Sequence, residues 1–179
     1  MAGSGRWRAP ALAGERVTLR QLDGRDAAAV WEMVNDVEGN DLTATTETFT
    51  REQIDAWCGS RPEQEERLDL AIIDKTTGQF VGEAVLNDFD AATDSCGFRI
   101  GLRGPAWFGR GFGTEATRLI VAHGLDTFGL SSISLEVLAR NPRARAVYDR
   151  VGFVVEREFD DDGESWIQMR ISDERPSSN

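Results

Sequence analysis

Three glycines at alternate positions constrain this chain more than any other feature of its sequence: Gly109, Gly111 and Gly113. They lie between an alternating run at 94–102, which predicts a strand, and an apolar-striped run at 114–128, which predicts a helix. Glycine lets a backbone turn tightly and approach a ligand closely. Successive N–H groups beside the positive end of a helix dipole can hold a phosphate or a diphosphate. We therefore expect an anion-binding loop here, or else an ordinary glycine-rich connection.

The same spacing argues against the two common nucleotide-binding motifs. A P-loop needs Gly-Lys-Ser/Thr, which this loop lacks. A Rossmann fingerprint needs Gly-x-Gly-x-x-Gly after a strand of a parallel sheet, whereas the strand here follows segments that look like antiparallel hairpins.

Segments of strand period and of helix period succeed one another in the order β-α-α-β-β-β-α-β-α-β-β. The expected strands are 16–22, 68–74, 79–87, 94–102, 132–138, 153–159 and 165–171. The expected helices begin after Asp23, after the capping box Thr50-x-x-Gln53, after the glycine-rich loop and at Asn141-Pro142. This order indicates the α/β (α+β) class with a mixed sheet.

Composition and charge exclude several classes of protein. The net charge is −11, and no basic patch that would bind nucleic acid is visible. No run is long and apolar enough to span a membrane, and residues 1–10 lack the apolar core of a signal peptide. Cys58 and Cys96 have neither zinc-site nor disulfide spacing, which fits a cytoplasmic location without a metal. The acidic balance fits a cationic substrate, or solubility alone.

We expect one domain at 12–172, with flexible ends at 1–11 and 173–179. The length is enough to bury a core without disulfides or metals.

Two sequence blocks resemble the GNAT N-acetyltransferase superfamily. Residues 107–116 are similar to its motif Gln/Arg-x-x-Gly-x-Gly/Ala, with Gly111 and Gly113 at the glycine positions and Phe108 in place of Gln or Arg. That departure is common in the branch of ribosomal-protein N-terminal acetyltransferases, and the residues at 107–116 resemble this branch. Residues 141–153 look like the second motif, in which an Asn precedes a helix that carries a Tyr and ends in Gly-Phe. The resemblance runs from about residue 12 to residue 171.

The resemblance implies a mostly antiparallel central sheet, flanked by helices, that parts between the strands at 94–102 and 132–138. The pantetheine arm of acetyl-CoA then lies in the gap and pairs with the backbone of Ile100, Gly101 and Leu102. The diphosphate lies on the amides of the loop. The residues implied for this second contact are Phe108, Gly109, Arg110, Gly111, Phe112, Gly113 and Thr114.

Acetyl transfer to an amine needs a base for the ammonium, a donor for the carbonyl oxygen and an acid for the departing thiolate. A backbone N–H near Leu102 can be the oxygen's donor. By the resemblance, Tyr148 is the acid, and Asn141 hydrogen-bonds the pantetheine arm. The alternatives are a packing tyrosine on an amphipathic helix and an asparagine that only caps that helix.

Glu83 is our candidate for the base. We expect it to share a strand face with Val81 and Val85, and apolar neighbours raise the pKa of a carboxyl. A structural Glu83, or deprotonation through water, stays open. We expect His123 to be structural, and Trp31 and Trp57 to line an acceptor pocket only if they reach the cleft.

The expected function is transfer of an acetyl group from acetyl-CoA to a primary amine in a ternary complex. The acceptor classes that fit are a protein N-terminus, a small amine or an antibiotic. A catalytically inactive CoA-binding sensor and an enzyme using another donor, such as succinyl-CoA, are the alternatives. Dimers are common in such families, so a homodimer also stays open.

Overall fold

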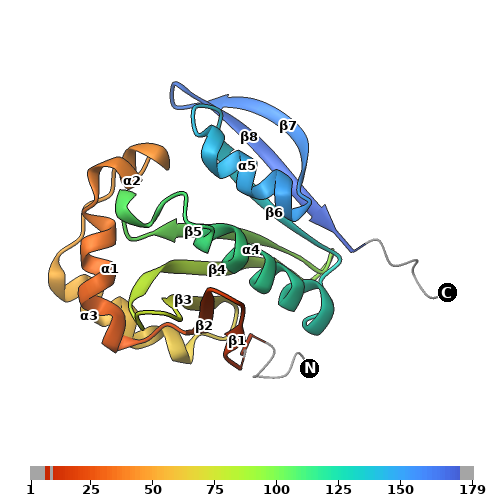
Figure 1. The fold of residues 1–179 in the computed structure, drawn as a ribbon. Coiled ribbons are helices and arrows are strands. Elements are labelled where there is room, and N and C mark those ends of the chain that lie inside the picture. Colours follow the sequence, from red (N-terminus) through yellow and green to blue (C-terminus); the bar gives the residue numbers. More distant parts are fainter. Residues whose placement is uncertain (1–6, 9, 174–179) are drawn as a thin grey trace.

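The computed structural model describes residues 7–8 and 10–173. Eight strands form one sheet in the order β1-β2-β3-β4-β5-β6-β8-β7 (Figure 1). Their bounds are β1 Leu12–Ala13, β2 Val17–Gln21, β3 Leu68–Asp74, β4 Phe80–Asp90, β5 Ser95–Leu102, β6 Ser132–Leu138, β7 Val154–Asp161 and β8 Glu164–Ser172. All neighbouring strands are antiparallel except β5 and β6, which are parallel. The expected mixed, mostly antiparallel sheet is therefore confirmed.

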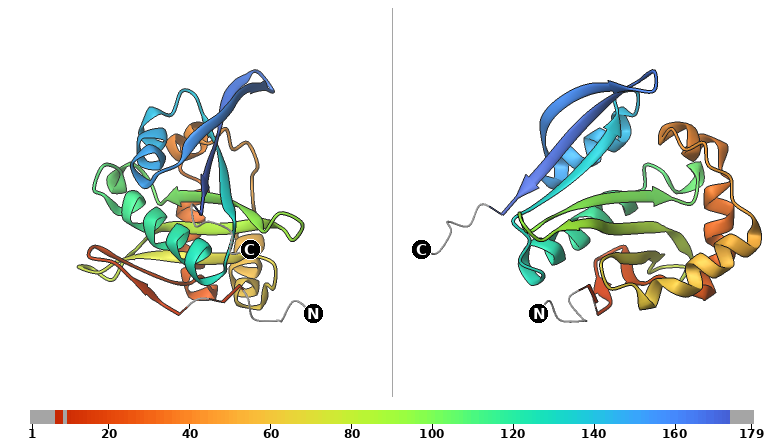
Figure 2. Two further views of the ribbon diagram at one scale, coloured as in Figure 1. Left: turned by 90° about the vertical axis from the view of Figure 1, so that its right-hand side faces the viewer. Right: turned by 180° about the vertical axis from the view of Figure 1, so that it is seen from behind.

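Helices cover both faces of the sheet (Figures 1 and 2). On one face, α4 (Phe112–Ala122) packs across β2 to β5 and lies beside α5 (Pro142–Val151). On the other face, α1 (Ala27–Val34) packs against α3 (Arg51–Ser60). The short α2 (Val37–Leu42) follows α1.

The two faces bury separate apolar clusters. The larger cluster lies between the sheet and α4 and α5, and it includes Leu70, Leu86 and Ile120. The smaller lies under α1 and α3 around Ile54 and Phe80. Burial of this apolar area is the main favourable term in folding.

The sheet parts where the resemblance places the gap. β5 and β6 pair only through Ser95–Ser132, Cys96–Ile133 and Gly97–Ser134. Beyond these three pairs β5 stays with β4, whereas β6 leaves with β8 and β7 (Figure 2). The expected opening between these two strands is confirmed.

The capping box expected at Thr50 and Gln53 forms. Asp23 caps the helix after it as expected, and the structure shows that it also forms a capping box with Asp26. The helix expected at 114–128 is different. It begins earlier, at Phe112, and its last part, His123–Thr127, is a wider π-helical turn rather than α-helix.

The ends at 1–11 and 173–179 are described only in part, because residues 1–6, 9 and 174–179 lie outside the described residues. Trp7 is buried, and its ring packs edge-on against Phe89 and Phe128.

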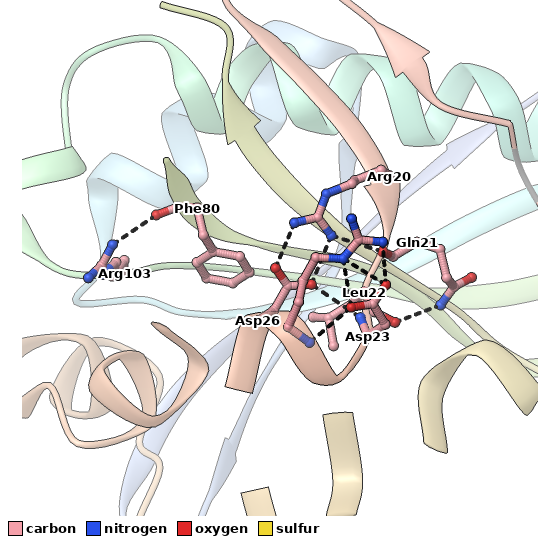
Figure 3. A network of polar contacts seen from close by, with 8 residues as sticks. Arg20, Gln21, Leu22, Asp23, Asp26, Phe80 and Arg103 are labelled. Atoms are coloured by element: carbon pink, nitrogen blue, oxygen red, sulfur yellow. Dashed lines mark hydrogen bonds and ion pairs between the residues drawn. The ribbon is translucent and has the colours of Figure 1, made fainter. Parts of the chain in front are cut away.

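Two carboxylates tie the first strands to the helices. Glu115 on α4 accepts backbone hydrogen bonds from residues 15, 16 and 17 at 2.9, 2.9 and 2.7 Å. Figure 3 shows the second tie, in which the buried Asp26 accepts two hydrogen bonds from Arg20 on β2, at 2.9 and 2.7 Å. These contacts hold β2 between the start of α4 and the start of α1.

Candidate active site

The unpaired part of β5 presents a free backbone edge to the gap. The carbonyl of Gly101 lies directly against Gly82 on β4, and the N–H of Arg103 donates to the carbonyl of Val81 at 2.9 Å. Alternate residues of a strand point their polar backbone groups to opposite edges. The N–H and C=O groups of Ile100 and Leu102 therefore face the gap, whereas those of Gly101 face β4.

The glycine-rich loop ends at the mouth of this gap with free amides. Gly109 and Gly111 have φ of 67° and 83°, in the left-handed region that favours glycine. Gly111 caps α4 without any side-chain hydrogen bond to the first turn. Within the described residues, the N–H groups of Phe112, Gly113 and Thr114 have no acceptor, so they and the helix dipole point at one spot outside the helix.

Three arginines surround that spot. The side chain of Arg16 lies beside Gly111: a methyl group placed on this glycine would be 3.6 Å from both Cδ and Nε of Arg16. Arg110 follows Gly109 in the loop and lies over the rings of Trp107 and Phe112. Arg143 on α5 lies 4.2 Å above the ring centre of Phe108. Free amides with arginines around them fit a diphosphate.

The contact between Phe108 and Arg143 explains how Phe108 can stand where the motif has Gln or Arg. Phe108 provides no charge of its own, but its ring holds the guanidinium of Arg143 beside the loop. Sequence reasoning missed Arg16 and Arg143, because both come from elements distant in the sequence.

Tyr148 lies on α5 beside the start of the gap. Its ring packs edge-on against Phe98, the first β5 residue beyond the last β5–β6 pair, with ring centres 6.2 Å apart. Burial raises the pKa of Tyr148 to about 12, so the phenol keeps its proton at neutral pH. The hydroxyl has no hydrogen-bond partner among the described residues, and Tyr148 as a whole is 8% exposed.

Asn141 caps α5 and also holds α2. Its Oδ1 accepts from the N–H of Ala144 at 3.2 Å, and its Nδ2 donates to the carbonyl of Leu42 at 3.1 Å. The capping role is therefore present, with one amide hydrogen left for another acceptor.

α2 and its flanks span the mouth of the gap. On the β5 side, Asp36 lies 3.5 Å from the position of a methyl group on Gly104. On the β6 side, Arg140 pairs with Asp41 at 3.0 Å and Asn141 binds Leu42. The segment 36–42 thus touches both walls of the opening.

Glu83 lies on the opposite face of the sheet from Tyr148. It pairs in register with Gly101, whose face is covered by Met33 of α1, whereas Tyr148 packs on the α4 and α5 face. Burial raises the pKa of Glu83, and the nearby Arg99 partly offsets this. Its Oε2 is buried and has no hydrogen-bond partner among the described residues.

The neighbours of Glu83 differ from those expected. The β3–β4 register shifts between Ile72 and Ile73, which pair with Gly82 and Phe80. This bulge turns Val81 into the cluster under α4, while Phe80 joins the cluster under α1 and α3. Val81 and Glu83 therefore do not share a face; Val85 and Glu83 do.

Sequence reasoning missed Glu136. Gly97 pairs with Ser134, so Arg99 on β5 and Glu136 on β6 occupy the next same-face positions on the two sides of the gap. Glu136 is exposed and has no ion-pair partner among the described residues. A charged residue within the otherwise largely apolar run 133–138 was the available sequence signal.

The remaining candidates are structural in different ways. His123 is buried against Phe128, with burial lowering its pKa, and lies in the π-helical turn away from the gap. Trp31 packs against the cluster under α1 and α3, and Trp57 carries the guanidinium of Arg61 on its ring. Within residues 7–8 and 10–173, no helix is long and apolar enough for a membrane span, and no side chains gather as metal ligands would.

Comparison with known proteins agrees with this geometry. The family profile described as Acetyltransferase (GNAT) domain matches residues 16–154. A Vibrio cholerae spermidine N-acetyltransferase solved with CoA and spermine superimposes with a TM-score of 0.78 at 20% identity, over 89% of this chain and 96% of that one.

Two further solved structures share the fold. A GNAT-family acetyltransferase from Bacillus anthracis gives a TM-score of 0.77 at 18% identity, over 91% and 98% of the two chains. A Vibrio cholerae protein provisionally described as a ribosomal-protein-serine acetyltransferase gives 0.75 at 16% identity, over 92% and 98%. A free strand edge beside an open helix N-terminus, together with the profile match over most of the chain, places this protein in the GNAT acetyltransferase family.

Proposed function

We propose that the chain transfers an acetyl group from acetyl-CoA to a primary amine that enters from the α1 and α3 face. The observation that carries the proposal is the parted β5–β6 pair with free amides at the start of α4 beside it. The edge at Ile100 and Leu102 suits the amide-bearing pantetheine arm, and the amides of 112–114 with Arg16, Arg110 and Arg143 suit the phosphates.

Glu83 receives the proton that the acceptor's ammonium must lose before it can attack. Burial raises the pKa of Glu83 towards neutral pH, and a general base works best when its pKa lies near the operating pH. Glu136, across the gap on the same face, is the other carboxylate that can take this role.

Bound acetyl-CoA supplies an acyl group activated as a thioester. The N–H of Leu102 faces the gap and can donate to the carbonyl oxygen as it becomes anionic, an effect typically worth about 3 kcal/mol. A nitrogen–carbon bond forms while the carbon–sulfur bond breaks and its electron pair leaves on sulfur. Tyr148 gives the sulfur a proton and regains one from the acylated nitrogen.

The test is release of CoA thiol from acetyl-CoA with a panel of amines, including a peptide N-terminus, spermidine and small amino compounds. Tyr148→Phe should lower turnover by about tenfold to a thousandfold and leave acetyl-CoA binding intact, because only the proton donor is lost. Calorimetry with CoA supplies the binding measurement.

The alternatives give different results in the same experiment. A chain that binds CoA but acylates no amine is a sensor rather than an enzyme. Mass spectrometry of the acyl-CoA that copurifies with the protein separates an acetyl donor from a succinyl or longer donor. A chain that does not bind CoA at all ends the proposal.

A further inference from the structure

The face of the sheet under α1 and α3, from which the acceptor is proposed to enter, carries a long ion pair beside the gap. Glu83 on β4 and Arg99 on β5 lie on neighbouring strands, with Arg99 Nη2 3.5 Å from Glu83 Oε1. The Arg99 side chain is 53% exposed, whereas the Glu83 side chain is 11% exposed. The arginine of the pair is thus accessible to an incoming molecule.

The charges next to this pair on the β3 side, Arg61, Arg67 and Asp69, are already committed to one another. Asp69 on β3 accepts from Arg67 at 2.8 and 2.7 Å and lies 3.8 Å from Arg61. Asp69 is fully buried, and both arginines are largely covered. Asp69 therefore holds Arg61 and Arg67, and Arg99 has only its long contact with Glu83 among the described residues.

Each member of the Glu83–Arg99 pair has unused hydrogen-bonding capacity. A guanidinium has five N–H donors in a planar fork, and Arg99 places one of them, at the limit of hydrogen-bond distance. Oε2 of Glu83 is buried without a donor from the described residues. A buried carboxylate oxygen without a donor costs free energy that a bound donor would recover.

We propose that the acceptor is an amino carboxylate, whose carboxylate binds Arg99 and whose ammonium binds Glu83. This inference rests on the proposed acetyl transfer and narrows its acceptor. The amino and carboxyl groups of an α-amino acid are separated by a single carbon, which matches the short separation of Arg99 and Glu83. The product is the N-acetyl amino carboxylate, with the thiol of CoA and one proton released.

Local charge favours such a zwitterion over a simple polycation. Arg61, Arg67 and Arg99 lie with the carboxylates Asp69 and Glu83 on this face, and Glu136 faces them across the gap, so the local charge is mixed rather than acidic. An ammonium group placed against Arg99 is repelled and a carboxylate there is attracted, and the overall negative charge of the chain is too distant to compensate at contact range. Engaging Arg99 with a substrate carboxylate also weakens its hold on Glu83, which makes that carboxylate a stronger base.

The experiment compares amino acids with their decarboxylated partners as acceptors for the full chain. The pairs are serine with ethanolamine, lysine with cadaverine and phenylalanine with phenylethylamine, and phenylalaninamide tests a neutral group of similar size. For at least one pair, kcat/KM should favour the carboxylate by about ten- to one-hundredfold, as expected for a charge-assisted contact. Arg99→Gln should abolish that preference through a higher KM for the amino acid.

The control is Arg51→Gln, since Arg51 on α3 is similarly exposed and, among the described residues, pairs only with Asp55 on its own helix. Arg51→Gln should keep the preference, and thermal unfolding should confirm that both variants fold. Arg99→Lys, which keeps the charge without the fork, should retain part of it.

Two failures can be told apart. Turnover of the decarboxylated amines or of spermidine as fast as, or faster than, the amino acids overturns the amino-carboxylate acceptor and leaves acetyl transfer standing. If no amine is acylated, acetyl transfer fails, and calorimetry of the CoA-loaded chain with the same pairs decides the inference separately. Amino acids that bind no better than the amines, or bind Arg99→Gln equally well, overturn it.

Discussion

At the scale of single residues, the proposed acid and the proposed base lie on the two faces of one sheet. Tyr148 keeps its proton because burial raises its pKa to about 12, and Glu83 on the other face holds its proton more tightly than an exposed carboxyl. The gap between β5 and β6 is the passage between the faces. In the proposed mechanism, an acyl group in that gap has a proton acceptor on one side and a proton donor on the other.

Glu83→Gln should inactivate the enzyme and stabilise the fold at neutral pH. A carboxyl whose pKa is raised on folding is most favourable below its unfolded pKa, and its contribution is lost as pH rises through the folded pKa. Glutamine has no charge to bury, so the thermal midpoint of E83Q should rise at pH 7 while kcat falls by about 10²- to 10⁴-fold.

The pH–rate profile distinguishes the base from a merely structural carboxylate. Wild-type activity should fall on the acid side as Glu83 takes up its proton, and E83Q should lose that limb. If Glu136→Gln removes the limb and E83Q keeps it, the base lies on β6 instead.

At the scale of elements, we expect CoA binding at the start of α4 to depend on the left-handed glycine that caps the helix. Gly111→Ala should weaken CoA binding about three- to tenfold, because a side chain at φ 83° is disfavoured by about 1–2 kcal/mol and the cap must shift. Its methyl group would meet Arg16 only at ordinary contact distance, so the backbone and not a clash causes the loss.

Gly129→Ala is the matched control for this variant. Gly129 has φ 69°, has open space around it and follows the other end of the same helical region. It should lower the thermal midpoint to a similar degree and leave the Kd for CoA unchanged, as calorimetry can show. Equal loss of CoA affinity in both variants would mean that fold stability, and not the cap, sets the affinity.

The π-helical turn at the end of α4 should make the fold acid-sensitive. Burial lowers the pKa of His123, and its Nε2 has no hydrogen-bond partner among the described residues. The unfolded chain therefore binds a proton below about pH 6.5 before the folded one does, and stability falls as pH drops from there towards the folded pKa. Urea unfolding at pH 7.5 and pH 5.5 should show a larger loss for the wild type than for His123→Phe.

The order and type of most elements could be predicted from the sequence, because their periodicity and caps are local. Asp23, Thr50 and Gly152 mark helix ends where the structure has them. The start of α4 was placed two residues late, since no side chain caps it. The two-residue β1 and the bulge beside Val81 depend on neighbouring strands, so no pattern within one segment could reveal them.

The candidate site was predictable only where a single segment supplies it. The loop at 108–114 and Tyr148 came from two blocks of sequence. Arg16, Arg143 and Glu136 reach the site through strand register and helix packing, which a linear reading does not contain.

At the scale of the whole molecule, both cysteines are free, buried and on different clusters of the core. Burial raises the pKa of each thiol to about 12, so neither forms the reactive thiolate near neutral pH. The folded chain should react with an aromatic disulfide reagent only slowly, and both thiols should react after denaturation. Absorbance of the released reagent measures this, and a fast-reacting thiol in the native chain would contradict the burial.

The opening in the sheet also bears on self-association. A strand with unpaired N–H and C=O groups ordinarily invites another chain to extend the sheet, which is the route to aggregates. Here the vacant rungs of β5 lie inside a wedge whose second wall is β6 and whose mouth the segment 36–42 bridges. A segment laid across a free strand edge protects it from pairing with another chain, so the edge that the proposed cofactor arm would use is also shielded from extension of the sheet between molecules.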